Sequence, residues 1–75
     1  MSRETIVIWA VVDSEGEIVD AKTTRTVAYK RVEFLDGWAE HNEKNGKGAT
    51  ANAHGRKVLA PFAVIRCVGA VEMKP

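Results

Sequence analysis

The chain has 75 residues, of which 45% are hydrophobic and 28% are charged, and its formal net charge is +1. This length suits one small domain, so we expect residues 1–75 to fold as a single unit. The apolar fraction is too high for a disordered chain, and no apolar run is long enough to cross a membrane as a helix. The composition therefore favours a folded, soluble protein.

The N-terminal apolar run, from Ile6 to Val12, ends at Asp13 without the small-residue cleavage pattern of a secretory signal. Cys67 is the only cysteine, so no disulfide can form within the chain. Secreted domains of this size usually depend on disulfides. These features predict a cytoplasmic protein.

A β-hairpin is predicted at the start of the chain. β-Branched and aromatic residues dominate the segment from Thr5 to Val12, which is typical of a strand. Residues 13–16 read Asp-Ser-Glu-Gly, a strong turn signal. We expect the return strand over residues 17–23, where Asp20 and Lys22 are the kind of charges found on a solvated edge strand.

The apolar spacing changes to that of a helix from Thr24 onward. Thr24 or Thr26 can cap the start of this helix, and the pattern fades at residues 41–42. One apolar row has the spacing of a single helix face and consists of Ala28, Val32, Leu35 and Ala39. A second apolar row lies beside it and consists of Val27, Phe34 and Trp38.

The second half of the chain predicts a loop and a strand. Residues 42–55 contain three glycines and no large apolar side chain, so we expect a flexible, glycine-rich basic loop. The main final strand is expected from Phe62 to Val68, with a bulge at Gly69 before a short extra strand at residues 70–73 as one alternative. The order of elements predicts an α+β domain of the type ββαβ, with one helix packed on a three-stranded sheet. The last strand can lie beside the first in either direction.

Both faces of the first and last strands are apolar, and one helix can cover only one face of a sheet. We expect the other face to remain open and to bind a protein partner or a second copy of the chain, as a homodimer. The residues predicted to form this protein-binding face are Val7, Trp9, Val11, Phe62 and Val64.

Charge is unevenly distributed along the chain. Residues 1–43 contain five basic and nine acidic side chains, whereas residues 44–75 contain six basic side chains and one acidic side chain. Four basic residues in and beside the loop have no acid among them, an arrangement suited to phosphates or to an acidic partner. They are Lys44, Lys47, Arg56 and Lys57. A nucleic-acid-binding loop and a simply solvated loop are both compatible with this pattern.

The sequence contains no specific catalytic or cofactor motif. Cys67 lies within the apolar final strand, where an inert core thiol is expected. His41 and His54 lack companions at metal-ligand spacing. Residues 46–51 match the glycine pattern of dinucleotide sites but follow a helix instead of a strand. We therefore expect no enzyme activity, no metal, no cofactor and no small-molecule substrate.

The order of elements, with a hairpin turning at Val12, Asp13 and Gly16, one helix and a final strand, resembles small accessory proteins encoded by phages and other mobile elements. The resemblance rests on size and element order and covers most of the chain. It implies a non-enzymatic protein that occupies the surface of a host protein as an inhibitor or modulator. The leading hypothesis is thus a protein-binding accessory module, and the alternative is a small nucleic-acid-binding protein using residues 44–57.

Overall fold

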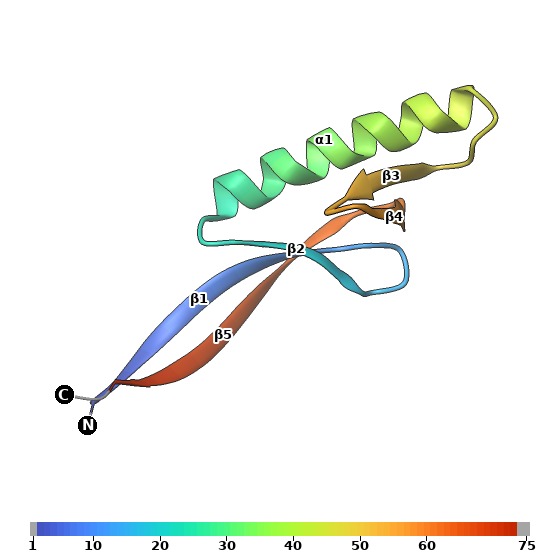
Figure 1. Cartoon of the computed structure of the whole chain (residues 1–75). Coiled ribbons are helices and arrows are strands. Elements are labelled where there is room, and N and C mark those ends of the chain that lie inside the picture. Colours follow the sequence, from blue (N-terminus) through green and yellow to red (C-terminus); the bar gives the residue numbers. More distant parts are fainter. Residues whose placement is uncertain (1, 74–75) are drawn as a thin grey trace.

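The computed structural model of the protein describes the backbone of residues 2–73 and the side chains of residues 4–69. Across these residues a single helix packs against a three-stranded antiparallel sheet, and a small two-stranded sheet lies beside them (Figure 1). The α+β class and the packing of one helix on three strands are confirmed. The elements are β1 (Ser2–Val12), β2 (Ile18–Lys22), α1 (Arg25–Lys44), β3 (Thr50–Ala53), β4 (Arg56–Leu59) and β5 (Ala63–Met73).

The larger sheet has the strand order β2-β1-β5, and both of its pairings are antiparallel. β5 pairs with β1 from Val12↔Ala63 to Ser2↔Met73, so the last strand runs antiparallel to the first. Gly69 pairs with Ile6 in an unbroken register. The alternative of a bulge at Gly69 is therefore wrong, and the apolar segment after it continues the same strand.

Helix α1 begins and ends at the residues whose side chains favour these ends. Thr24 has an extended backbone, and its hydroxyl oxygen accepts the N–H of Val27 at 3.4 Å. Of the two predicted caps, Thr24 is therefore the one used, because its oxygen satisfies an N–H that has no partner within the helix. At the other end, the N–H of Asn45 donates to the carbonyls of His41 and Asn42, each at 3.2 Å.

The predicted loop at residues 42–55 is not a single irregular segment. It contains the last turn of α1 and the strand β3, which pairs with β4. Ala51 and Ala53 are almost fully buried, because their short side chains let β3 approach the helix. The turn between β3 and β4 consists of His54 and Gly55, whose φ angles of 49° and 76° are those of a two-residue hairpin turn. Sequence periodicity missed this hairpin because its strands have four residues each.

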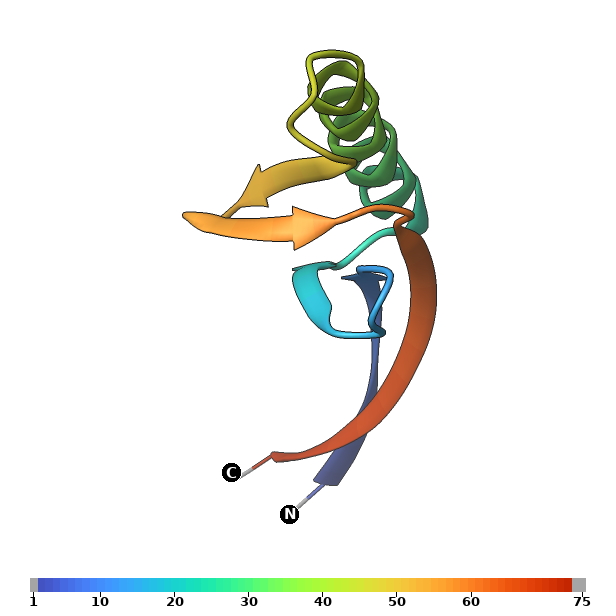
Figure 2. The ribbon, with the colours of Figure 1, turned by 90° about the vertical axis from the view of Figure 1, so that its right-hand side faces the viewer.

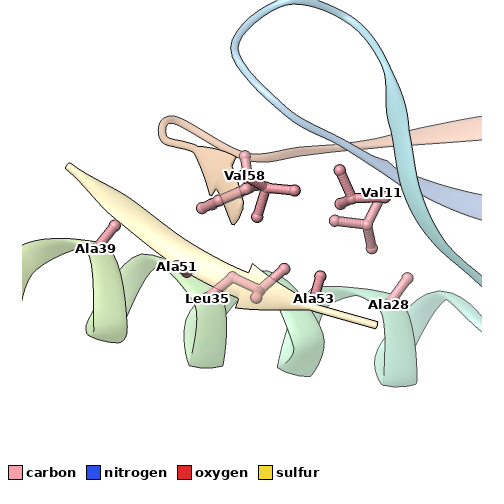
Figure 3. Packing of buried hydrophobic residues seen from close by; sticks show 9 residues of the cluster. Val11, Ala28, Leu35, Ala39, Ala51, Ala53 and Val58 are labelled. Atoms are coloured by element: carbon pink, nitrogen blue, oxygen red, sulfur yellow. The ribbon is translucent and has the colours of Figure 1, made fainter. Parts of the chain in front are cut away.

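The hydrophobic core lies between α1, the β3–β4 hairpin and the adjoining ends of β1, β2 and β5. Leu35 and Val11 are completely buried at its centre, and the alanines of α1 face the alanines of β3 (Figure 3). The predicted helix row lies on this side, as its positions require. The cluster consists of Val11, Val19, Ala28, Leu35, Ala39, Ala51, Ala53, Val58 and Phe62.

The molecule is elongated, with extents of 54 × 20 × 17 Å (Figures 1 and 2). Its radius of gyration is 15.1 Å, whereas a compact domain of this length would have about 11 Å. The difference comes from β1 and β5, which stay paired beyond the last residue of β2. We call residues 2–8 and 67–73 the arm. Ser2 pairs with Met73, so both ends of the described chain meet at the tip of the arm (Figure 1).

Candidate interaction surface

One face of the three-stranded sheet is turned away from the core. Between Ile6 and the end of the sheet that lies next to the core, this face carries only uncharged residues. Because side chains alternate along a strand, the cross-strand pairs Ile6↔Gly69, Ile8↔Cys67 and Ala10↔Ile65 share this face. Ala21 of β2 pairs with Ala10 and extends it. We call its exposed part the open face, which consists of Ile6, Ile8, Ala21, Ala63, Ile65, Cys67 and Gly69, whereas Ala10 and Val12 on the same side are only 2% and 6% exposed.

The open face leaves large apolar side chains in contact with water. Ile6, Ile8 and Ile65 retain 39%, 38% and 47% of their surface. Cys67 is half-buried between them, and its thiol lies 3.9 Å from the carbonyl oxygen of Ile65. Exposed isoleucines on neighbouring strands form a continuous apolar surface, which is a common feature of protein-binding sites.

The sequence predicted one open face, but it assigned the open face to the wrong side of the sheet. Val11 and Phe62 are 0% and 7% exposed and belong to the core. Trp9 and Val64 pack against that core, and Val7 is half-buried where the arm begins. The reason is that both faces have the same apolar composition, so only the position of α1 decides which face is covered.

A second apolar area runs along the exposed side of α1. Val27, Phe34 and Trp38 are 46%, 53% and 49% exposed. The rings of Phe34 and Trp38 meet edge to face at 6.4 Å, and the Trp38 and His41 rings lie 5.7 Å apart. The rings of Phe34, Trp38 and His41 line a shallow depression together with Gly37. The sequence showed this row as a second apolar row beside the buried one, but it did not indicate that the second row is exposed.

Asp20 is the centre of the main group of charged contacts. Its side chain is only 7% exposed and lies 3.1 Å from Nε of Arg31, 3.3 Å from Nζ of Lys22 and 3.2 Å from Nε2 of His54. Burial acts to raise the pKa of Asp20, but hydrogen bonds from His54, the Ala21 N–H and Lys22 outweigh it and hold the pKa below the usual value of 3.8. The carboxylate thus ties β2, α1 and the β3–β4 turn together.

This role of Asp20 corrects its interpretation as a solvated edge charge. Sequence reasoning missed it because its partners, Arg31 and His54, come from distant segments of the chain. An edge-strand aspartate gives no sign of a cation opposite until the helix is in place. The arrangement supports the fold, and the described residues contain no group of three or more His, Cys, Asp or Glu side chains that could hold a metal ion.

The four predicted nucleic-acid-binding residues divide into two pairs. Lys44 lies 3.1 Å from Glu40, and Arg56 lies 3.7 Å from Glu17, so acids partly neutralise these two cations. Lys47 and Lys57 instead line one polar depression. The uncharged residues of that depression are Asn42, Thr50 and Asn52.

The comparisons with known proteins give no relative for this geometry. No protein-family model, no curated protein and no solved structure matches the chain. Within residues 2–73, no helix has the length and apolar character needed to span a membrane.

Proposed function

We propose that the protein is a non-enzymatic protein-binding module whose binding surface is the open face. The observation that supports this proposal is a sheet surface without charge that exposes Ile6, Ile8 and Ile65 together. Contiguous apolar patches of this kind are uncommon on small monomeric proteins and usually mark an interaction site. The partner would present an apolar surface of its own, since the open face has no charge with which to select an acidic or basic one.

The arm supports a protein partner over a small ligand. An isolated two-stranded ribbon is at best marginally stable in water, and the arm is such a ribbon beyond the end of β2. A partner that covers the open face would bury the arm's isoleucines and stabilise it. Small ligands bind in concave pockets, whereas this surface spreads over three strands. Occupation of a host protein's surface by a mobile-element accessory protein is one form of this function.

The proposal is tested with a charge placed on the open face. Immobilised wild-type protein should retain a defined partner from extracts of the source cells. Ile8→Lys should reduce that retention at least tenfold, because a lysine would be desolvated in the interface. Val27→Lys is the matched control, since Val27 is a similarly exposed aliphatic residue on α1. Equal retention by wild type and Ile8→Lys, with both folded by circular dichroism, would contradict a binding role for the open face.

A second candidate function rests on the depression that Lys47 and Lys57 share with three uncharged polar residues. Two lysines beside amide and hydroxyl groups suit a phosphate of a nucleic acid. If this site binds nucleic acid, a mobility shift on mixed DNA and RNA should weaken steeply as salt rises. The double variant Lys47→Gln/Lys57→Gln should remove the shift, while Lys44→Gln should retain it. Absence of any shift at low salt would exclude this candidate.

A further inference from the structure

The outer edge of β5 is an unpaired strand edge that has two charged residues, Arg66 and Glu72, but no proline, lysine or bulge. β5 is the last strand of the order β2-β1-β5, and no backbone hydrogen bond from another described segment reaches its outer edge. The strand has 11 residues, contains neither proline nor lysine, and pairs with β1 without irregularity. Long edges of this kind favour pairing with another strand.

Gly69 lies inside this edge strand, and nothing among the described residues requires a glycine there. Its φ is not positive, its pairing with Ile6 shows no bulge, and a Cβ built on it would meet no described atom within 4 Å. Glycine weakens the interior of a strand, and its presence often marks the close approach of another backbone. The position therefore points to a neighbour that this single chain does not supply.

We propose that two copies of the chain associate by antiparallel pairing of their β5 edges, with the two-fold axis at Gly69. In this register Gly69 lies opposite Gly69 of the second copy. Arg66 lies opposite position 72, a glutamate, and the symmetry creates this opposite-charge pair twice. In the same register, position 65 lies opposite position 73, and position 67 lies opposite position 71.

The antiparallel arrangement also fits the shape of the molecule. Each copy's core lies near Ala63, at the opposite end of β5 from the tip of its arm (Figure 1). The two cores would therefore sit at opposite ends of the joined arms and would not collide. The result is a six-stranded sheet of order β2-β1-β5-β5-β1-β2, roughly 40 Å long from the Ala63 end of one copy to that of the other at the usual rise per strand residue. The two open faces would lie on the same side and form one surface of twice the width.

This dimer goes beyond the proposed protein-binding function and does not depend on it. It uses backbone groups at the edge of the sheet, whereas the proposed function uses side chains on its face. Ile8→Lys should therefore leave the dimer intact even where it removes the binding of a partner protein.

The first experiment fixes the stoichiometry and the register with the full-length chain. Sedimentation equilibrium should give about twice the chain mass of 8.2 kDa at micromolar concentration. In a Cys67→Ser background, Gly69→Cys should form an intermolecular disulfide under mild oxidation, because directly opposite residues in an antiparallel pair lie within disulfide range. Ile65→Cys in the same background is the matched control, since its two copies would be about 27 Å apart.

The second experiment tests the paired charges. Arg66→Glu should weaken the dimer about tenfold or more, since like charges would then lie opposite each other twice. The triple variant Arg66→Glu/Glu72→Arg/Arg3→Glu should restore the wild-type dissociation constant, because it reverses the intermolecular pair while keeping opposite charges at the Arg3↔Glu72 position within each chain. This restoration also shows that the single variant did not act by unfolding the arm.

Three results would overturn the proposal. The first is a wild-type protein that remains a monomer at 100 μM. This concentration is about a hundredfold above the micromolar dissociation constant expected for the dimer. The second is cross-linking of Ile65→Cys as fast as that of Gly69→Cys. The third is a dimer that Arg66→Glu leaves unchanged. None of these results would affect the test of partner binding with Ile8→Lys.

Discussion

The arm and the rest of the molecule are built from similar residues but differ in how deeply these residues are buried. Val11 and Ile6 are both β-branched residues of β1, yet Val11 is 0% exposed in the core and Ile6 is 39% exposed in the arm. Val11 has α1 and the β3–β4 hairpin above it, whereas Ile6 has neither. The burial of these two residues is therefore decided by whether α1 and the β3–β4 hairpin cover them, and not by the residue type or the strand.

The largest expected effect on stability comes from truncating a core side chain, and the same truncation in the arm serves as the comparison. Leu35→Ala should lower the free energy of unfolding by about 3 kcal/mol, because it removes part of a fully buried side chain and leaves a cavity in its place. Ile6→Ala should cost less than about 1 kcal/mol, since much of that side chain already contacts water. Urea denaturation in dilute solution measures both values. Similar losses for the two variants would contradict the distinction between core and arm.

The next effect concerns the charged group that ties the elements of the core end together. Asp20→Asn should destabilise the protein by about 1–2 kcal/mol at pH 7, because Lys22 and Arg31 lose a buried anionic partner and the contact with His54 is weakened. The pKa of Asp20 is lower in the folded state than in the unfolded state. Its carboxylate therefore contributes stability above about pH 4, and this contribution is lost as the pH falls through the folded pKa.

The pH dependence provides the check on Asp20. The difference in unfolding free energy between wild type and Asp20→Asn should shrink below pH 4. Glu15→Gln is a suitable control, because Glu15 is an exposed acid of the β1–β2 turn without an ion pair in the described residues. A difference that stays constant down to pH 2 would show that the negative charge of Asp20 is not what stabilises the fold.

Hydrogen exchange sharpens the comparison without a mutation. In dilute protein, backbone amides of the arm should exchange faster than those in the middle of α1, because a two-stranded ribbon opens locally at low cost. When the concentration rises above the dissociation constant of the proposed dimer, protection in residues 67–73 should increase about tenfold, while α1 should change little. An arm that is as protected as the helix at all concentrations would mean that it needs no partner.

The smallest expected effect distinguishes two neighbouring threonines at the start of α1. Thr24→Ala should cost about 0.5 kcal/mol, at the low end for a helix cap because its bond to the Val27 N–H is long at 3.4 Å. Thr26→Ala should be neutral within the error of a thermal melt, since Thr26 is exposed inside the helix. An effect of Thr26→Ala larger than that of Thr24→Ala would show that Thr24 is not the residue that caps the helix.

Much of the fold follows from local patterns. The Asp-Ser-Glu-Gly turn and the β-branched run before it fix the first hairpin, and the spacing of Ala28, Leu35 and Ala39 fixes the helix. These features depend on residues close together in the sequence, so a single sequence displays them. The antiparallel direction of β5 was left open, because a long connection permits either direction.

The parts that the sequence did not reveal depend on distant contacts. Strand β3 is buried by its alanines against α1, a feature that resembles a small-residue loop until the helix is in place. The one local signal was His54-Gly55, a dipeptide that suits a two-residue hairpin turn. The open face was expected but placed on the wrong side, because Trp9 and Ile8 are equally apolar and only the position of α1 distinguishes them.

The pairing of Ser2 with Met73 has a practical consequence for protein engineering. A polypeptide that enters the domain at Ser2 leaves it again at Met73, at the same point in space. The unit is therefore suited to insertion into a surface loop of a carrier protein, with little distortion of either host or guest. It is equally suited to circular permutation, with the old ends joined by a short linker and new ends opened in the glycine-containing connection between α1 and β3.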